Sequence, residues 1–373
     1  MSARRRRSPI RVLTAVPICD GHDSAINTIN LELIRHGVEV IYLGYHRSAR
    51  DIVRAAIQED VRAVGISSYN GGHLEFFREV IDLLERNGAG DIRVFGGGGG
   101  TITAKDAAAM QRKGVDRIFF AGESLDEIVK FVRSEYGGNG NARPKKASGD
   151  RRIATMLTEI ESGKTSADHR LKSRATVIGI TGPGGAGKTT LIDELVLRLL
   201  ASRPKVRIAI LSHDPSILGK GALLGDRAAM IHSQHDRVYM RSFATRGRAG
   251  GISAATRRSV AAVIGSGAEI VLIETVGIGQ EAVPFGKGLV DKSVFVMSPD
   301  YGARLQLQKI AMLDAADIVV LNKSDLPGAP AASTEIRQRI RSDNPRCREI
   351  AFTCAKRHRD AGVDDLMKLL ELA

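Results

Sequence analysis

The stretch Thr181-Gly-Pro-Gly-Gly-Ala-Gly-Lys-Thr-Thr190 carries most of what this sequence predicts. It fits the pattern G-x-x-x-x-G-K-[ST], a glycine-rich loop whose backbone N–H groups wrap a di- or triphosphate. The apolar residues 175–180 before it predict a strand, and residues 191–200 after it predict a helix. Because this loop requires a strand before it and a helix after it, we expect a nucleotide site here.

Phosphate chemistry assigns roles within this loop. Its lysine, Lys188, reaches the outer phosphates of a bound nucleotide, and the hydroxyl group of the next residue, Thr189, binds Mg²⁺. The predicted phosphate-binding residues are Gly182, Gly184, Gly185, Ala186, Gly187, Lys188, Thr189 and Thr190.

The identity of the base is predicted by Asn322-Lys-Ser-Asp325, which follows an apolar strand. It matches the N-K-x-D element, in which the aspartate accepts from the N1 and N2 donors of guanine. Adenine has an acceptor at N1 and no 2-amino group, so a carboxylate discriminates between the two bases. In isolation four such residues indicate only a polar turn, but downstream of a phosphate loop they indicate GTP. With the small-residue loop after the next strand, the predicted base-binding residues are Asn322, Lys323, Asp325, Cys354, Ala355 and Lys356.

Composition limits the other classes of function. The 373 residues, 43% apolar and 26% charged, are enough for two globular domains. No apolar run approaches the ~18 residues of a membrane span, and the basic tail 1–9 lacks the apolar segment of a secretory signal. Three scattered cysteines favour a reducing cytoplasm over a disulfide framework. The net charge of +13 invites a nucleic-acid interpretation, but with only 4% aromatic residues to stack on bases we expect no nucleic-acid partner.

Two α/β domains joined by a linker are predicted from the order of apolar strands and amphipathic helices. Residues 10–136 alternate five strands with helices, which predicts a parallel sheet wound in the flavodoxin manner. The polar, glycine-rich residues 137–150 form the linker. Residues 151–373, beginning with a helical lead-in, form a second doubly wound domain around the phosphate loop. The predicted strands are 11–16, 38–44, 63–67, 92–95 and 117–120, then 175–180, 206–211, 269–274, 293–297, 318–321 and 349–352.

Two further runs in the second domain narrow the kind of GTPase. Residues 271–280 stand where GTPases have D-x-x-G, with Glu274 in place of the aspartate and Gly277 able to present its N–H to a γ-phosphate. Residues 212–227 contain two carboxylates, Asp214 and Asp226, whose ordinary roles would be helix capping and solvation.

Together these runs resemble the GTPase chaperones of adenosylcobalamin-dependent acyl-CoA mutases. The resemblance implies GTP with Mg²⁺, slow hydrolysis, and coupling of hydrolysis to loading or removal of the mutase cofactor. It implies switch segments at about 214–230 and 277–290, while Gln280 receives no firm role. The implied Mg²⁺ ligands are Thr189, Asp214, Asp226 and Glu274, and the implied catalytic residues are Lys188, Thr189, Glu274 and Gly277.

The first domain contains Asp20-Gly-His-Asp-Ser-Ala25, directly after the first strand. A single loop histidine is usually just solvated, but this segment resembles D-x-H-x-x-G, the signature of base-off, His-on cobalamin domains, with alanine at the last position. The resemblance implies that His22 is the lower cobalt ligand and that Asp20 fixes its tautomer. It also implies that cobalamin contacts Ser67 and Tyr69, where Tyr69 replaces a leucine, and the glycines Gly97 and Gly98.

Residues 20–25, residues 69–73 and the five glycines at 96–100 are most similar to those of the isobutyryl-CoA mutase type. A mutase binds its acyl-CoA in a (β/α)₈ barrel of ~250 residues, for which this sequence has no room. We therefore expect a cobalamin-carrying subunit fused to its GTPase chaperone, with adenosylcobalamin, GTP and Mg²⁺ as cofactors. The expected partners are a separate barrel subunit and an adenosyltransferase, in a homodimer or hetero-oligomer. An N-terminal fragment of a fused mutase, or a cobalamin-dependent GTPase sensor, are the alternatives.

Overall fold

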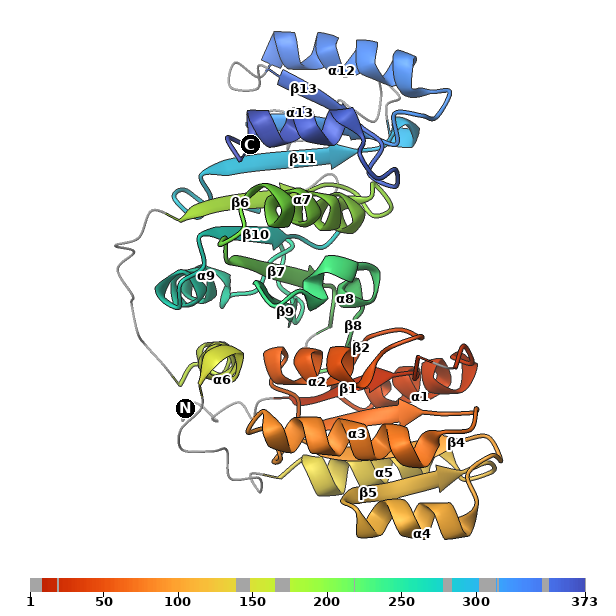
Figure 1. The fold of residues 1–373 in the computed structure, drawn as a ribbon. Helices are drawn as coiled ribbons and strands as arrows, with labels where there is room; N and C mark the ends of the chain where they lie inside the picture. The colour runs from red at the N-terminus through yellow and green to blue at the C-terminus, as the bar shows by residue number, and fades with distance from the viewer. Residues whose placement is uncertain are drawn as a thin grey trace. The chain divides into compact units, whose positions relative to one another are not determined.

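The computed structural model describes residues 9–18, 20–138, 148–164, 175–217, 219–277, 284–301, 313, 315–343 and 349–372. It divides into two compact units, one of Met1–Ala167 with Ser216–Ala228 and one of Asp168–Pro215 with Ala229–Ala373. Each unit contains one parallel β-sheet (Figure 1). In the described part of the chain, every helix is too short or too polar to cross a bilayer.

The sheet of the first unit has the strand order β5-β4-β3-β1-β2-β8 among the described residues. Strands β2, β1, β3, β4 and β5 follow the flavodoxin order 2-1-3-4-5, and each neighbouring pair among them is parallel, which confirms the predicted fold class. The strands are β1 (Ile10–Ala15), β2 (Val38–Tyr42), β3 (Ala63–Ser67), β4 (Arg93–Gly98), β5 (Val115–Phe120) and β8 (Ala222–Leu224). The helices are α1 (Ser24–Arg35), α2 (Ala49–Gln58), α3 (His73–Arg86), α4 (Ala104–Arg112), α5 (Leu125–Tyr136), α6 (Gly149–Glu161) and α8 (Asp226–Ala229).

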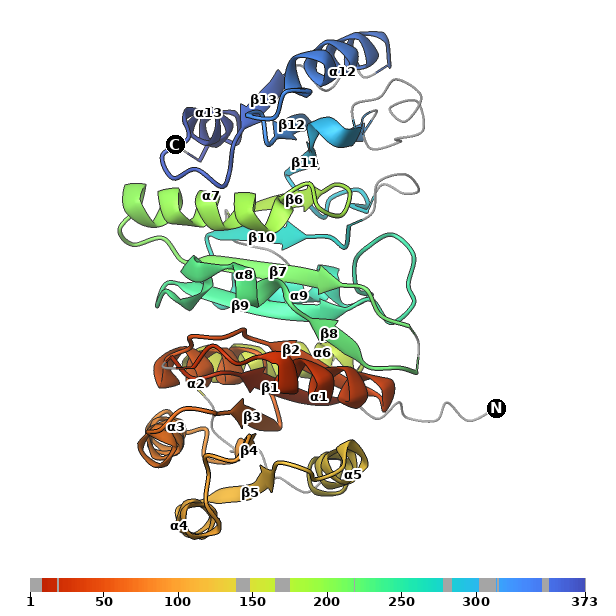
Figure 2. The same cartoon turned by 90° about the vertical axis from the view of Figure 1, so that its right-hand side faces the viewer.

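Helices cover both faces of this sheet. Figure 2 shows α3 and α4 on one side of β3, β4 and β5, with α5 on the other. On the α1 and α5 face, alternate strand residues such as Val12, Val40 and Phe95 pack against Leu33 and Val132. Because both faces are buried, the strands are continuous apolar runs rather than alternating ones.

The boundary between the units differs from the predicted domain boundary. Helix α6, predicted to begin the GTPase domain, belongs to the first unit and packs against α2. The segment 216–228 also belongs to the first unit, where β8 adds a parallel sixth strand at the edge formed by β2. Most of the predicted linker, residues 139–147, lies outside the described residues.

The second unit has a parallel seven-stranded sheet in the order β13-β12-β11-β6-β10-β7-β9, counted over the described residues. Its strands are β6 (Thr176–Thr181), β7 (Ile208–Asp214), β9 (Val238–Ala244), β10 (Ile270–Glu274), β11 (Lys292–Met297), β12 (Ile318–Asn322) and β13 (Glu349–Thr353). Its helices are α7 (Lys188–Ser202), α9 (Thr256–Gly265), α12 (Ala329–Asp343) and α13 (Ala361–Leu369), with short 3₁₀ helices η1 (Ile231–Gln234) and η2 (Pro299–Tyr301).

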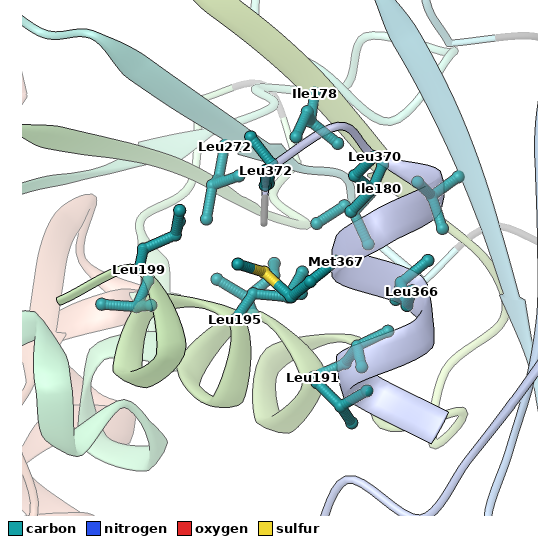
Figure 3. Close-up of a cluster of buried hydrophobic side chains, with 14 of the residues drawn as sticks. Ile178, Ile180, Leu191, Leu195, Leu199, Leu272, Leu366, Met367, Leu370 and Leu372 are labelled. Carbon is teal, nitrogen blue, oxygen red and sulfur yellow. The ribbon is translucent and has the colours of Figure 1, made fainter. Parts of the chain in front are cut away.

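Alternation along the strands of this sheet builds a core on each face. Val294 and Val320 point to the side of α7 and α13, whereas Phe295 and Val319 point to the side of α12. Figure 3 shows the first of these cores, where leucines of α7 meet Leu366 and Met367 of α13, and Leu370 just after it, beside β6 and β10. A sheet covered on both faces presents its polar chemistry at its edges, and in parallel sheets ligands bind at the carboxyl edge.

Candidate functional site: a phosphate loop and a buried aspartate–histidine pair

The phosphate loop lies between the end of β6 and the start of α7, as the sequence predicts. Gly182, Gly185 and Gly187 have positive φ angles of 144°, 76° and 87°, which residues with a side chain rarely adopt. At Gly182 a Cβ atom would also lie 2.0 Å from the carbonyl oxygen of Val296. The glycines are therefore required by the loop's own backbone, and loops of this kind bind phosphate through backbone N–H groups.

Lys188 is buried, and its Nζ atom donates to the carbonyl oxygens of Gly182 at 2.9 Å and Pro183 at 3.2 Å. The loop thus holds the lysine over its own backbone. Of the other predicted phosphate-binding residues, Ala186 is buried, whereas Gly184, Gly185 and Thr190 are exposed.

The candidate metal ligands of the second unit lie at the carboxyl edge of its sheet. Thr189 donates from Oγ1 to Oε1 of Glu274 at 2.7 Å, and Glu274, the last residue of β10, is buried. Asp214 is the last residue of the neighbouring strand β7. In the pairing of β7 with β10, Ser212 lies opposite Glu274. A hydroxyl group and carboxylates are the hard oxygen ligands that Mg²⁺ prefers, so these residues fit that ion.

Asp226, by contrast, opens α8 in the first unit, and its role as a metal ligand stays a prediction. In the described part of the chain no three His, Cys, Asp or Glu side chains gather closely enough to hold a metal ion by themselves. Since Mg²⁺ is usually bound through one or two carboxylates plus substrate phosphates, nucleotide phosphates would complete the ligand set.

The chain after Glu274 runs directly beside the phosphate loop. Thr275 donates its backbone N–H to the carbonyl oxygen of Ile180 at 3.1 Å. At Gly277, a Cβ atom would lie 2.7 Å from the Cα atom of Gly184, so only glycine fits this approach. Gly277 is thereby placed next to where phosphates would bind, while Gln280 lies outside the described residues.

The guanine element follows β12, and its asparagine ties three loops together. Asn322 donates from Nδ2 to the carbonyl oxygen of Ala186 at 2.9 Å. Its Oδ1 accepts from the Thr353 hydroxyl at 3.0 Å and from the Ala355 N–H at 3.1 Å. The phosphate loop and the two predicted base-binding loops therefore share one buried hub. Lys323 next to it has a positive φ of 57°.

Asp325, three residues after Asn322, is the carboxylate of the N-K-x-D element. Its oxygens accept from Lys356 Nζ at 2.9 Å and from Cys354 Sγ at 3.2 Å. Hydrogen bonding to Lys356, and next to Cys354, lowers the pKa of Asp325 to about 2. Burial, with a smaller contribution from Asp325, raises the pKa of the Cys354 thiol. The group that would accept from guanine is therefore ionised at neutral pH.

In the first unit, Asp20 and His22 form the pair that the sequence predicts. The Oδ1 atom of Asp20 lies 2.7 Å from Nδ1 of His22 and accepts the His22 backbone N–H at 3.0 Å. Its other oxygen accepts the backbone N–H groups of Tyr69 and Asn70. Burial raises the pKa of Asp20, but the hydrogen bonds from His22, Tyr69 and Asn70 outweigh burial, and the pKa lies below its ordinary value.

The geometry of this pair fits a metal-ligating histidine. Asp20 is fully buried, whereas the His22 side chain is 64% exposed. A carboxylate can only accept, so it places the ring proton on Nδ1 and leaves Nε2 as the lone-pair nitrogen. Tyr69 lies beside the ring, with the two ring centroids 5.3 Å apart. These features suit a cobalt ion with Nε2 as ligand.

The other residues predicted to contact cobalamin lie at the carboxyl ends of β3 and β4 and have structural roles as well. Ser67 ends β3 and is buried. A Cβ atom at Gly97 would lie 2.8 Å from the Phe119 carbonyl oxygen, and one at Gly98 would lie 2.1 Å from the Ser68 carbonyl oxygen. Packing between neighbouring strands thus requires both glycines. His73 is buried at the start of α3, with Nε2 3.4 Å from an Asp106 oxygen, and Cys19 lies outside the described residues.

Comparison with known families agrees with this geometry. Residues 157–371 match the model described as methylmalonyl Co-A mutase-associated GTPase MeaB. The chain belongs to the MeaB GTPase family. Residues 10–130 match the model of the B12 binding domain, so a B12-binding domain precedes the MeaB domain. The predicted family is confirmed.

Curated relatives show the same pair of domains inside longer proteins. The chain is 39% identical to a fused isobutyryl-CoA mutase of Geobacillus kaustophilus, over 90% of this chain and 33% of that protein. It is 40% identical to the one of Cupriavidus metallidurans, over 95% of this chain and 35% of that protein. The MeaB portion alone is 36% identical to a putative GTPase of Pyrococcus abyssi, over 55% of this chain and 65% of that protein. The chain thus spans about a third of the fused relatives.

Some residues of these sites escaped prediction. Asn70 was not singled out, although its backbone N–H binds Asp20. Thr353 was not in the predicted base-binding set, although its hydroxyl group holds Asn322. Both contacts join residues that are distant in sequence, at the carboxyl ends of adjacent strands. The only signal available beforehand was that each follows a predicted strand.

Proposed function

We propose that this chain is the cobalamin-carrying component of an adenosylcobalamin-dependent acyl-CoA mutase of the isobutyryl-CoA mutase kind, fused to the GTPase that gates loading and removal of its cofactor. The Asp20–His22 pair carries the proposal, because it provides a cobalt-binding site on the same chain as a MeaB family GTPase. The fused relatives carry both domains within longer proteins. Their length supports a substrate-binding part, either on a separate subunit or further along the same polypeptide.

In this proposal Asp20 holds the His22 ring so that its Nε2 atom would ligate the cobalt of bound cobalamin. Bound adenosylcobalamin supplies a cobalt–carbon bond whose homolysis starts radical rearrangements. Tyr69, Ser67, Gly97 and Gly98 line the approach to the displaced tail of the cofactor.

On the nucleotide side, Thr189, Asp214 and Glu274 hold Mg²⁺ and Lys188 binds the outer phosphates of GTP. The N–H of Gly277 contacts the γ-phosphate, and Asp325 selects guanine. Hydrolysis removes the γ-phosphate contact at Gly277. The partners are a barrel subunit and an adenosyltransferase, in a homodimer or hetero-oligomer in the cytoplasm.

The visible spectrum of adenosylcobalamin mixed with the full chain tests the cofactor half of this proposal. We expect adenosylcobalamin bound to the wild type to show the spectrum of nitrogen-ligated cobalt, and adenosylcobalamin bound to His22→Ala to show the base-off spectrum. His36→Ala is the matched control, because His36 is a partly exposed histidine of the same unit whose Nδ1 bonds the Glu32 carbonyl oxygen. A nitrogen-ligated spectrum of the cofactor bound to His22→Ala would reject His22 as the cobalt ligand.

Mutase assays with a panel of acyl-CoAs and a barrel subunit test the assembly. Rearrangement that requires both this chain and the barrel subunit supports the proposal. A chain that binds cobalamin and hydrolyses GTP, yet supports no rearrangement with any barrel subunit, favours the sensor alternative.

A further inference from the structure

A buried histidine stands directly behind the candidate magnesium site. His213 precedes Asp214 at the end of β7 and is 1% exposed. Its Nδ1 atom lies 2.7 Å from the backbone carbonyl oxygen of Glu274, and its Nε2 atom lies 2.8 Å from Oγ1 of Thr256. One imidazole ring therefore connects the ends of β7 and β10 to the start of α9.

The orientation of this ring is fixed. A carbonyl oxygen can only accept a hydrogen bond, so Nδ1 of His213 carries a proton and donates to Glu274. The ring stacks on Phe243, with centroids 5.3 Å apart and an angle of 20° between the planes. Phe243 is itself fully buried in β9. A flipped ring would lose both hydrogen bonds, and a tilted ring would lose the stacking contact as well.

The carbonyl group held by His213 belongs to the residue that connects the sheet to the nucleotide site. The carboxylate of Glu274 accepts from Thr189 at 2.7 Å, and the N–H of the next residue, Thr275, donates to Ile180 at 3.1 Å. His213 and Ile180 thus hold the peptide group between Glu274 and Thr275 from two sides. That peptide group sets the direction of the Glu274 side chain and the start of the segment leading to Gly277.

The second nitrogen extends this arrangement to α9. Thr256 is buried, and its Oγ1 atom also lies 2.8 Å from the Ser253 carbonyl oxygen. The loop before α9 in turn contacts the segment after β10, where Val276 donates its N–H to the Gly251 carbonyl oxygen at 3.1 Å. Both ends of the His213 ring therefore stabilise elements that border the nucleotide site, while the ring itself stays buried.

We propose that His213 is a positioning residue for Mg²⁺-dependent GTP turnover: it fixes the Glu274 peptide, and through it the carboxylate that pairs with Thr189. The proposal rests on the proposed GTP hydrolysis at this site. His213 acts through Glu274, as outer-shell partners of metal ligands do. The link to Thr256 secures the ring, and the link to Glu274 is the functional one.

Two isosteric substitutions separate these links. In His213→Asn the side-chain amide nitrogen stands near the former Nδ1 and can still donate to Glu274. In His213→Gln the amide reaches toward the former Nε2 position and Thr256, and the donor to Glu274 is lost. Thr256→Val is the matched control, because it removes the hydroxyl group at the Nε2 end and leaves the Nδ1 end in place.

The measurements are the GTP hydrolysis rate and the affinity for fluorescent mant-GDP with and without Mg²⁺. For His213→Gln we expect kcat and the Mg²⁺-dependent gain in mant-GDP affinity to fall by about tenfold, with Mg²⁺-free affinity unchanged. His213→Asn and Thr256→Val should stay within about threefold of the wild type in both measurements. Thermal melting identifies any variant that does not fold.

Equal behaviour of His213→Asn and His213→Gln would overturn the positioning role, and so would a loss in Thr256→Val as large as in His213→Gln. If His213→Gln does not fold, loss of the Mg²⁺-dependent gain in folded His213→Asn overturns it instead. Failure of the proposed function is recognised separately, since the wild type would then show no GTP hydrolysis. The mant-GDP titrations would still rank the variants in that case.

Discussion

Arg227 donates from Nε to the Oε1 atom of Glu59 at 3.1 Å, and neither side chain is exposed to solvent. Arg227 also bonds Gln58, while the second oxygen of Glu59 accepts from Arg11 at 2.7 Å. The pair joins residues 168 positions apart in the chain. The pair anchors the segment 216–228 to the end of α2 and, through Arg11, to β1 of the first unit. This segment follows Pro215, where the chain leaves the second unit.

Arg227→Met should destabilise the first unit by about 3 kcal/mol, because it leaves Glu59 as a buried carboxylate with one guanidinium partner fewer. Calorimetric melting of the full chain measures this as a lower melting temperature of the first unit. Arg35→Ala is the control, since Arg35 forms an exposed pair with Glu32 and its loss should cost at most about 1 kcal/mol. Equal melting of the two variants would contradict a stabilising anchor.

Lys188→Ala should lower the rate of GTP hydrolysis by at least about a hundredfold, because it removes the cation that reaches the outer phosphates. The fold should persist, since the hydrogen bonds from Lys188 to Gly182 and Pro183 join groups of the same loop. Lys205→Ala, at an exposed lysine after α7, is the control. Phosphate release assays check the rate, and wild-type turnover in Lys188→Ala would reject the phosphate-loop assignment.

Asp325→Asn should reduce the preference for GTP over xanthosine triphosphate by about tenfold or more, because an amide donates where the 2-position of xanthine accepts. Competition binding with the two nucleotides measures the ratio. Asp365→Asn, at an exposed carboxylate of α13, should leave the ratio unchanged. An unchanged ratio in Asp325→Asn would contradict the guanine assignment.

The same carboxylate predicts how guanine selectivity depends on pH. Since the pKa of Asp325 is lowered to about 2 by Lys356 and Cys354, Asp325 stays ionised across the whole physiological range. The preference for GTP over ATP should therefore be constant between about pH 5 and pH 8. A preference that titrates within that range would point to another discriminating group.

Asp20 predicts a stability effect at acid pH. Its folded-state pKa lies below the ordinary value of 3.8, so its ionised form is favoured by folding. The stabilisation is fully present above the unfolded-state value and is lost as the pH falls through the lower folded-state pKa. The melting-temperature difference between wild type and Asp20→Asn should be constant from neutral pH to about pH 5 and shrink below about pH 4. A difference that grows on acidification would contradict this sign.

Much of the fold follows from local patterns, because a parallel sheet buried on both faces leaves continuous apolar runs between helices. The prediction of β3 as residues 63–67 agrees with the structure, and the five strands of the first domain are confirmed in the flavodoxin order. Strand β9 was missed because Arg241 and Ser242 interrupt its apolar run, although both are fully buried. Their burial is a property of the tertiary structure, and no local pattern can show it.

The position of residues 216–228 could not be predicted either. Strand β8 has only three residues, and its partner β2 lies some 180 positions earlier. Local sequence carries no record of such a pairing. Gly221 shows how specific it is, since a Cβ atom there would lie 2.0 Å from the Val38 carbonyl oxygen. Asp226, expected at the nucleotide site by resemblance, is consequently part of the other unit.

The sequence by itself determined the chemistry of this protein: a phosphate loop needs glycines and a lysine at fixed spacing within a few residues, and Asp20 and His22 are two residues apart. Such short-range requirements leave a direct trace in the order of residues. Only the tertiary structure decided which unit each later segment joins, and that His213 stands between Glu274 and Thr256. Those relationships depend on burial and on pairing between distant strands, whose free energy exists only once the chain has folded.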